Sequence, residues 1–360
     1  MAIFPTVPTQ LATALAERLA GAVIAPDHFE YETARRVWNG MIDKRPAAIA
    51  RCADADDVAT AVRFAAEQGL PLAVRGGGHN VAGTAVVDDG LVIDLSAMRA
   101  VRIDAAGRTV HVQGGATWAD VDRVTAPLGL AAPGGVVSET GVAGLALNGG
   151  VSHQRRRDGM TVDNLISAEV VLADGRQVRA SAGDHADLHW ALRGGGGNFG
   201  VVTSFELRVH ELGPEVFALN VAYPIEDAGR VLAGWRDAVA DAPDELSTAG
   251  LIWSLPVADE LPEQLRGLPY VGVAGSSAEL PVPWMQRIGA PLPRSSWWSR
   301  TLVVMSIRRP YARAAPAASG ELPIYSTRSC CIANRAAPAR VESRPSRRCA
   351  PRGGRRSSRR

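Results

Sequence analysis

One stretch decides how this chain folds: Pro71-Leu72-Ala73-Val74-Arg75-Gly76-Gly77-Gly78-His79-Asn80-Val81-Ala82-Gly83. Its apolar start predicts a strand, and the three glycines that follow predict a loop. Because glycine permits positive φ and a close backbone approach, consecutive N–H groups here can form a concave anion site suited to a pyrophosphate. His79 would then stand over the bound group. A tight surface turn with an incidental histidine explains the pattern equally well, since glycine-rich loops are weakly specific.

The residues before this loop predict a parallel β-α-β unit. Residues 46–50 have strand character, and residues 58–68 repeat apolar positions at helical spacing. Acidic residues within 54–57 suit the N-terminus of that helix, and Gly69 suits its C-cap. The second strand of the unit would therefore deliver the glycine loop. Residues 11–19 predict a short amphipathic helix ahead of the unit.

Two further glycine-rich segments follow. Between residues 133 and 165 glycine recurs too often for a plain helix, so we expect backbone that packs closely against a planar cofactor. Residues 193–203 contain a formal Gly-x-Gly-x-x-Gly. A dinucleotide fingerprint requires the order strand, loop, helix. Here a predicted helix precedes the loop and a predicted strand follows it, which argues against a Rossmann site.

Together the three segments resemble the FAD-linked oxidases of the berberine-bridge-enzyme-like branch of the vanillyl-alcohol-oxidase superfamily, over roughly residues 36–209. The resemblance implies that the first loop binds the FAD pyrophosphate and that His79 is bonded covalently to the flavin 8α-methyl group. It implies that the second segment wraps the isoalloxazine ring and that the backbone of Val201 contacts the adenine side. The residues expected to bind FAD are Arg75, Gly76, Gly77, Gly78, His79, Asn80, Gly83, Gly134, Gly141, Gly144, Gly149, Gly150, Asp163, Asn164 and Val201.

This sequence departs from the family pattern at several positions. Ser152 and Asp158 stand where the family usually has a glycine and an aromatic residue. Val137 stands where some relatives carry a second covalent attachment through cysteine, so one covalent link is expected, through His79. In relatives the catalytic base is usually a tyrosine or glutamate from the substrate sheet or the C-terminal segment, and no catalytic residue is named for this chain.

The resemblance implies an α+β fold: a two-subdomain PCMH-type FAD-binding domain followed by a truncated antiparallel-sheet substrate domain. We expect an N-terminal helix and lead-in over residues 1–35 and the FAD-binding domain over 36–212. A partial substrate domain would occupy 213–275, and a largely disordered Arg/Ala/Pro-rich tail 276–360.

The tail differs sharply from the body. From Ser306 onward it carries 14 arginines and two acidic residues, so the tail is about +12 and the body about −10. Such a composition cannot bury a core. Because the chain has 38 arginines and one lysine, Lys44, we expect a GC-rich gene and a frameshifted translation beginning near Ser276. The rival interpretation is a basic arm that binds nucleic acid.

The function implied is that of an oxidase. An alcohol, sugar or related small molecule would give hydride to covalently bound FAD, and oxygen would reoxidise it to give hydrogen peroxide. The alternatives are an inactive flavin-binding remnant and, less favoured, a nucleic-acid binder acting through the tail. The expected partners are a small-molecule substrate and oxygen, and the oligomeric state is left open.

Other sequence patterns argue against a membrane protein, a disulfide-rich protein and a metal-binding protein. No apolar run is long enough to span a membrane, and no secretory signal is seen, so a cytoplasmic location is expected. Four cysteines, three of them in the tail, do not indicate a disulfide framework. His185 and His189 are four residues apart but lack a third ligand, so packing roles are expected and no metal site is predicted. The run 155–157 of three arginines favours a solvated face over contact with an anion.

Overall fold

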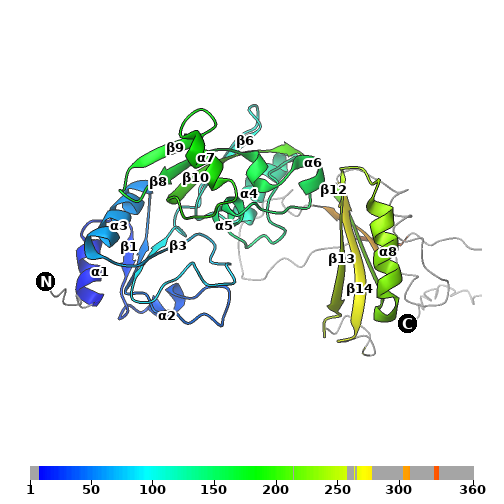
Figure 1. Ribbon diagram of the computed structural model, residues 1–360, viewed down its shortest axis with the longest axis horizontal. Helices are drawn as coiled ribbons and strands as arrows, with labels where there is room; N and C mark the ends of the chain where they lie inside the picture. Colours follow the sequence, from blue (N-terminus) through cyan, green and yellow to red (C-terminus); the bar gives the residue numbers. More distant parts are fainter. Residues whose placement is uncertain are drawn as a thin grey trace, which may run out of the picture.

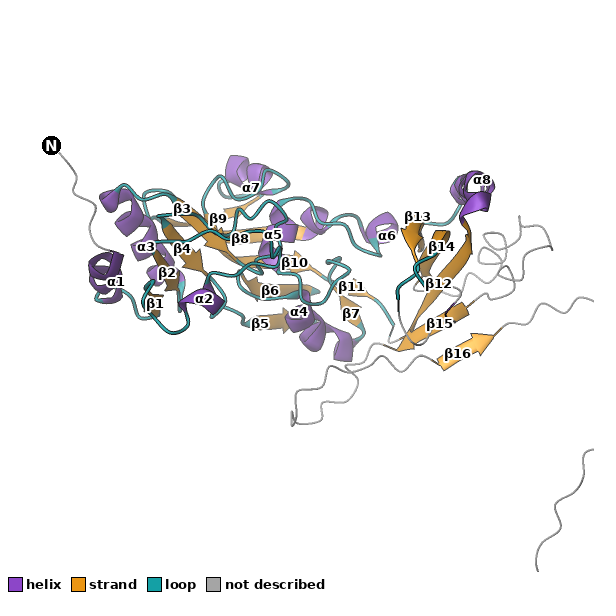
Figure 2. Cartoon of the chain, turned by 90° about the horizontal axis from the view of Figure 1, so that it is seen from below, coloured by secondary structure: helices purple, strands orange, loops and turns teal. Residues whose placement is uncertain are grey.

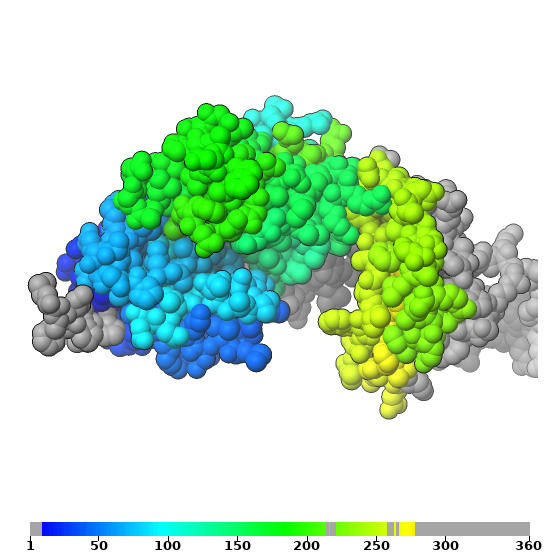
Figure 3. Space-filling view, in the orientation of Figure 1, coloured from blue at the N-terminus to red at the C-terminus, as the bar shows by residue number. Residues whose placement is uncertain are grey.

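The computed structural model describes residues 8–213, 215–257, 263, 266–277, 303–308 and 328–331. Two sheets and their helices form an N-terminal body, and a third sheet stands beside this body (Figure 1). Figure 3 shows the surface hollowed between the first part of the body, in blue and cyan, and the third sheet, in yellow. This mixed architecture of sheets and helices agrees with the expected α+β class.

The first subdomain is built on a sheet in the order β1-β2-β4-β3. Strand β4 lies between β2 and β3 and is parallel to both, which confirms the predicted β-α-β unit. Helix α3 connects β2 to β3. Its N-cap Asp54 accepts hydrogen bonds from the N–H groups of Asp56 and Asp57, and its C-cap Gly69 is left-handed. The elements are α1 Pro8–Ala16, β1 Ala22–Ile24, α2 Tyr31–Ala34, β2 Ala48–Arg51, α3 Ala55–Gln68, β3 Leu72–Arg75 and β4 Leu91–Asp94.

The second subdomain is an antiparallel sheet in the order β5-β6-β10-β8-β9, with short helices around it (Figure 2). The sheet contains two hairpins, in which β5 pairs with β6 and β8 pairs with β9. The elements are β5 Val101–Asp104, β6 Thr109–Gln113, α4 Trp118–Thr125, η1 Ala126–Leu128, β7 Leu130–Ala131, α5 Val142–Leu147, α6 Arg155–Asp158, η2 Thr161–Asn164, β8 Leu165–Val171, β9 Gln177–Ser181, α7 Ala186–Leu192, β10 Val201–Arg208 and β11 His210–Glu211.

The two subdomains share a core. Val171 at the end of β8 and Val201 at the start of β10 pack among the buried residues of the first subdomain. The apolar residues of α3 and of the central strand β4, such as Phe64 and Ile93, belong to the same cluster. Burial of these side chains fixes the first subdomain against the ends of strands β8 and β10 of the second sheet, where the glycine-rich segments lie.

The third sheet has the order β13-β14-β12-β15-β16, and α8 packs on one face. Val221, Tyr223, Leu246 and Val271 are buried there with Val231 of the helix. Burial raises the pKa of Tyr223 to about 12. The elements are β12 Glu215–Pro224, η3 Ile225–Asp227, α8 Ala228–Val239, β13 Leu246–Ser254, β14 Pro269–Ser277, β15 Val303–Arg308 and β16 Arg328–Cys331.

Strand β4 begins at Leu91, after a turn that places Asp89 at φ 53°. Helix α7 has His185 as its N-cap. Two expectations about the C-terminal part of the chain need correction. The boundary expected at residue 275 falls inside β14, and β15 and β16 come from the segment expected to be a tail. Backbone pairing with β12 and β15 places these two strands in the sheet. The rest of that tail lies outside the described residues.

Candidate cofactor-binding site

An internal ion pair holds the base of the first glycine loop. Strands β3 and β4 are parallel neighbours that end at Arg75 and Asp94, so the two side chains meet at one edge of the sheet. The Arg75 Nη2 to Asp94 Oδ2 distance is 2.6 Å, and both residues are buried. Arg75 also donates to the carbonyl oxygen of Ala34. The Arg75 side chain is therefore committed to the protein, and its predicted part in FAD binding would come from its backbone.

The loop itself leaves a row of backbone donors unpaired. Within the described ranges, no acceptor is paired with the N–H of Gly76, Gly77, Gly78, His79 or Asn80. Gly78 has φ 69°, which bends the loop in a way that other residues rarely adopt. Successive free N–H groups in such a bend carry partial positive charge and can bind the oxygens of a phosphate.

Glycine at these positions allows three segments to meet. A Cβ on Gly77 would lie 2.4 Å from the backbone nitrogen of Gly141, so the first and second segments touch backbone to backbone. A Cβ on Gly76 would lie 3.0 Å from the carbonyl oxygen of Gly114. Gly114 in turn donates to the carbonyl of Thr203, next to the end of the third segment. Tertiary structure thus gathers the first loop, Gly141 and the start of β10.

His79 lies beside a side chain that the sequence pattern did not assign to the site. The rings of Trp38 and His79 stack with centroids 5.8 Å apart and an interplanar angle of 23°. The backbone N–H of Trp38 donates to the carbonyl of Gly78, and the side-chain amide of Asn39 donates to the carbonyl of Val81. The segment Trp38-Asn39-Gly40 was not among the residues expected to bind FAD. In the structure it supports the histidine loop.

A cavity of about 560 Å³ adjoins the same loop. Its lining includes Gly76, Gly77 and Gly78 together with Trp38 and Asp94. Open volume beside the unpaired N–H groups is what a phosphate-bearing cofactor requires. The residues present therefore fit the pyrophosphate of FAD.

The remaining predicted residues are spread around this centre. Gly144 has open space where its Cβ would be, whereas Gly149 and Gly150 have positive φ and pack against Met160 and Thr161. Gly83 has φ 69° and packs against Ile42.

Four further predicted residues serve other contacts. Asp163 accepts from the N–H of Met160, and Asn164 Oδ1 lies 2.6 Å from His210 Nε2. These two side chains hold the turn after α6. Val201 is buried, and Gly134 packs on Trp118.

The prediction for the arginine run was wrong for its first two members. Arg155 donates to the carbonyl oxygen of Thr248 at 2.9 Å, and Arg156 donates to the carbonyl of Ala242 at 2.7 Å. Both acceptors belong to the third sheet or the loop leading into it. These arginines therefore join the FAD-binding body to the third sheet. Local sequence could not reveal this, because the acceptors are about 90 residues away and are backbone atoms.

Of the two histidines, His189 has the packing role that was expected. His189 is buried, and its Nε2 lies 3.2 Å from the carbonyl oxygen of Leu165. His185 Nδ1 lies 2.8 Å from Asp184. Across the described ranges, no group of three or more potential metal ligands is found.

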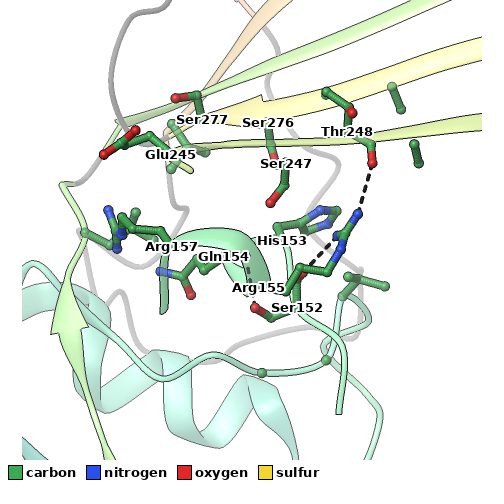
Figure 4. A pocket seen from close by; sticks show the side chains of 18 of the residues that line it. Ser152, His153, Gln154, Arg155, Arg157, Glu245, Ser247, Thr248, Ser276 and Ser277 are labelled. Atoms are coloured by element: carbon green, nitrogen blue, oxygen red, sulfur yellow. Dashed lines mark hydrogen bonds between the residues drawn. The ribbon is translucent and has the colours of Figure 1, made fainter. Parts of the chain in front are cut away.

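A second cavity, also of about 560 Å³, lies between the body and the third sheet (Figure 4). It is lined from below by residues of α4 and of the segment around α6, and from above by β13 and β14. Of the residues expected to bind FAD, Gly134 lines this cavity, and the polar side chains of the lining come from segments far apart in the chain.

Comparison with known proteins agrees with this geometry. Residues 46–181 match a family described as an FAD binding domain. The fold and the glycine loop resemble those of FAD-linked oxidoreductases.

Among individual proteins, (R)-6-hydroxynicotine oxidase of Paenarthrobacter nicotinovorans is 38% identical over 240 residues, which cover 66% of this chain and 52% of that protein. The crystal structure of 6-hydroxy-D-nicotine oxidase from Arthrobacter nicotinovorans has a TM-score of 0.72 at 32% identity, covering 82% of this chain and 63% of the other.

The fold is also that of Physcomitrella patens BBE-like 1, with a TM-score of 0.70 at 24% identity, covering 81% of this chain and 61% of the other. The chain spans about half the length of the curated relatives it matches. Among the relatives are proteins named FAD-linked oxidoreductases.

Among the described residues, no helix is both long enough and apolar enough to cross a membrane.

Proposed function

We propose that this chain acts as an FAD-dependent oxidase on an alcohol, sugar or related small molecule. The substrate would be oxidised by hydride transfer, and oxygen would be reduced to hydrogen peroxide. The observation that carries this proposal is the row of unpaired N–H groups at Gly76–Asn80, beside His79 and in backbone contact with Gly141. Bound FAD supplies the redox chemistry, and the protein binds and orients it.

The residues have separate tasks in this proposal. The N–H groups of the first loop bind the pyrophosphate, and His79 forms the single covalent bond to the flavin 8α-methyl group. Trp38 holds the imidazole in place by stacking. Gly144 leaves room for a planar ring, because no described atom beyond its own helix and chain neighbours lies within 4 Å of where its Cβ would be. Val201 contributes its backbone on the adenine side.

The first test is the visible absorption spectrum of the purified protein before and after acid precipitation. We expect flavin bands that stay with the pellet and are lost from the pellet in His79→Ala. Hydrogen peroxide release is then measured with a panel of alcohols and sugars. A flavin that acid releases into the supernatant would refute the covalent bond, and a colourless protein would refute the flavoprotein assignment.

The second candidate is a flavin-binding remnant without activity, the alternative that the changed composition after about Ser276 favours. A flavin-loaded protein that releases no peroxide with any member of the panel would support it. Nucleic-acid binding through the arginine-rich tail rests on residues outside the described ranges. Steeply salt-dependent DNA binding that disappears when residues after Ser306 are removed would support this function.

We also propose that the composition from about Ser276 onward results from a frameshift. The coding DNA tests this directly: another reading frame should encode a continuation that resembles the relatives. If neither alternative frame does so, the proposal is wrong.

A further inference from the structure

Unpartnered hydrogen-bond donors concentrate at the cavity between the body and the third sheet. Four buried side-chain polar atoms have no partner within the described part of the chain, and three of them belong to residues that line this cavity: Trp118 Nε1, Gln154 Nε2 and Ser247 Oγ. Trp118 is 2% exposed and Ser247 is 3% exposed. A buried donor without an acceptor is costly, so these groups indicate a ligand that supplies acceptors.

Arg155 adds positive charge to the same place. Its guanidinium donates to the carbonyl oxygens of Ser152 at 3.1 Å and Thr248 at 2.9 Å (Figure 4). Within the described ranges no carboxylate forms an ion pair with it, whereas the neighbouring Arg157 lies 2.7 Å from Asp158. Two neutral carbonyls orient Arg155 but leave its charge uncompensated.

The cavity is lined by other charged and titratable groups. Glu245 of the loop before β13 lies toward Arg157, at the opposite end of the view in Figure 4. Ser247 descends from β13 between Gln154 and Arg155 in that view. Desolvation, and then the charge of Arg155, lower the pKa of His153. Asp122 on α4 also lines the cavity.

We propose that Gln154, Arg155 and Ser247, with the indole N–H of Trp118, form a subsite for a carboxylate of the substrate. A carboxylate has about four acceptor positions, which matches these donors and the positive charge of Arg155. The inference rests on the proposed oxidase function and narrows its substrate to a hydroxy acid or an acidic sugar.

The subsite is tested by isothermal titration calorimetry of the full-length, flavin-containing protein with benzoate and with benzamide, which has the same shape without the charge. We expect benzoate to bind roughly tenfold more tightly, because charge-assisted hydrogen bonds are stronger than neutral ones. Arg155→Gln should abolish this preference, and Gln154→Leu should weaken benzoate binding. The control is Arg156→Gln, which removes a similar contact between the body and the third sheet but does not line the cavity, and should keep the preference.

Two results would overturn the subsite. One is equal affinity for benzoate and benzamide in the wild-type protein, which does not depend on any variant folding. The other is an Arg155→Gln variant that keeps the wild-type preference for benzoate, since the charge of Arg155 would then not serve the subsite. A colourless protein that still prefers benzoate would keep the subsite and refute the proposed oxidase, so the two proposals fail separately.

Discussion

The carboxylate of Asp94 lies 2.6 Å from the guanidinium of Arg75, and both are buried at the ends of neighbouring parallel strands. Asp94 also accepts from the N–H of Ser96, and its Oδ2 lies 3.7 Å from Arg51 Nε. Because Arg75 directly precedes the first glycine loop, this ion pair fixes where the loop leaves the sheet.

Removing one partner of this ion pair should be strongly destabilising. Asp94→Asn leaves the Arg75 charge buried without compensation, and we expect a loss of ~3–5 kcal/mol in the free energy of unfolding. Urea denaturation of both proteins measures it. The control is Glu67→Gln, which breaks the exposed ion pair with Arg18 and should cost less than ~1 kcal/mol. Equal losses in the two variants would contradict the role given to burial.

A methyl group on Gly77 should separate the first two glycine segments. Its Cβ would lie 2.4 Å from the backbone of Gly141, and a backbone atom cannot move aside as a flexible side chain can. We expect Gly77→Ala to lower stability by ~1–3 kcal/mol, as overpacking does, and to abolish flavin retention. Thermal unfolding and the ratio of flavin to protein absorbance measure the two effects. Unchanged flavin content would show that this contact is dispensable.

Gly144→Ala separates cofactor contact from folding. Because no atom surrounds the site of its Cβ, alanine in helix α5 should raise stability by up to ~1 kcal/mol while lowering flavin content. The matched control is Gly229→Ala in α8, which also meets open space and should raise stability without affecting flavin. If Gly144→Ala retains flavin as well as the wild type does, the planar ring does not pack against this residue.

Acid should remove the contribution of Asp120 to stability. This buried carboxylate caps α4. Burial would raise its pKa, but hydrogen bonds from Thr117, Arg99 and Arg123 outweigh that effect and lower the pKa to about 2. Since the folded value lies below the unfolded one, the ionised form stabilises the fold above about pH 4, and the contribution is lost as the pH falls toward 2.

We therefore expect Asp120→Asn to cost ~2 kcal/mol at pH 7, and the difference from the wild type to shrink by about half near pH 3. Chemical denaturation at several pH values measures it. The exposed Glu17→Gln serves as the control and should show no comparable difference. A difference that stays constant between pH 7 and pH 3 would mean that Asp120 acts through packing and not through its charge.

Local patterns in the sequence determined much of the first two subdomains. The caps at Asp54 and Gly69 and the turn at Asp174-Gly175 are short-range signals, because the responsible hydrogen bonds and φ values lie within a few residues. The pattern of strand, glycine loop and histidine at residues 71–83 was likewise readable, and within the described ranges the N–H groups of Gly76–Asn80 have no acceptor. Their binding of FAD stays a prediction.

Only the tertiary structure decided which distant groups meet. Gly77 touches Gly141 and Arg155 reaches the carbonyl of Thr248 because separate sheets are packed together. Trp38 stacks on His79 because two loops of the first subdomain meet. Packing of the sheets also brings Gln154 and Ser247, whose donors have no partner within the described ranges, to one cavity. A run of arginines has the same local pattern on a solvated face as it has between two domains. Burial and long-range hydrogen bonding, which local sequence does not encode, distinguish the two.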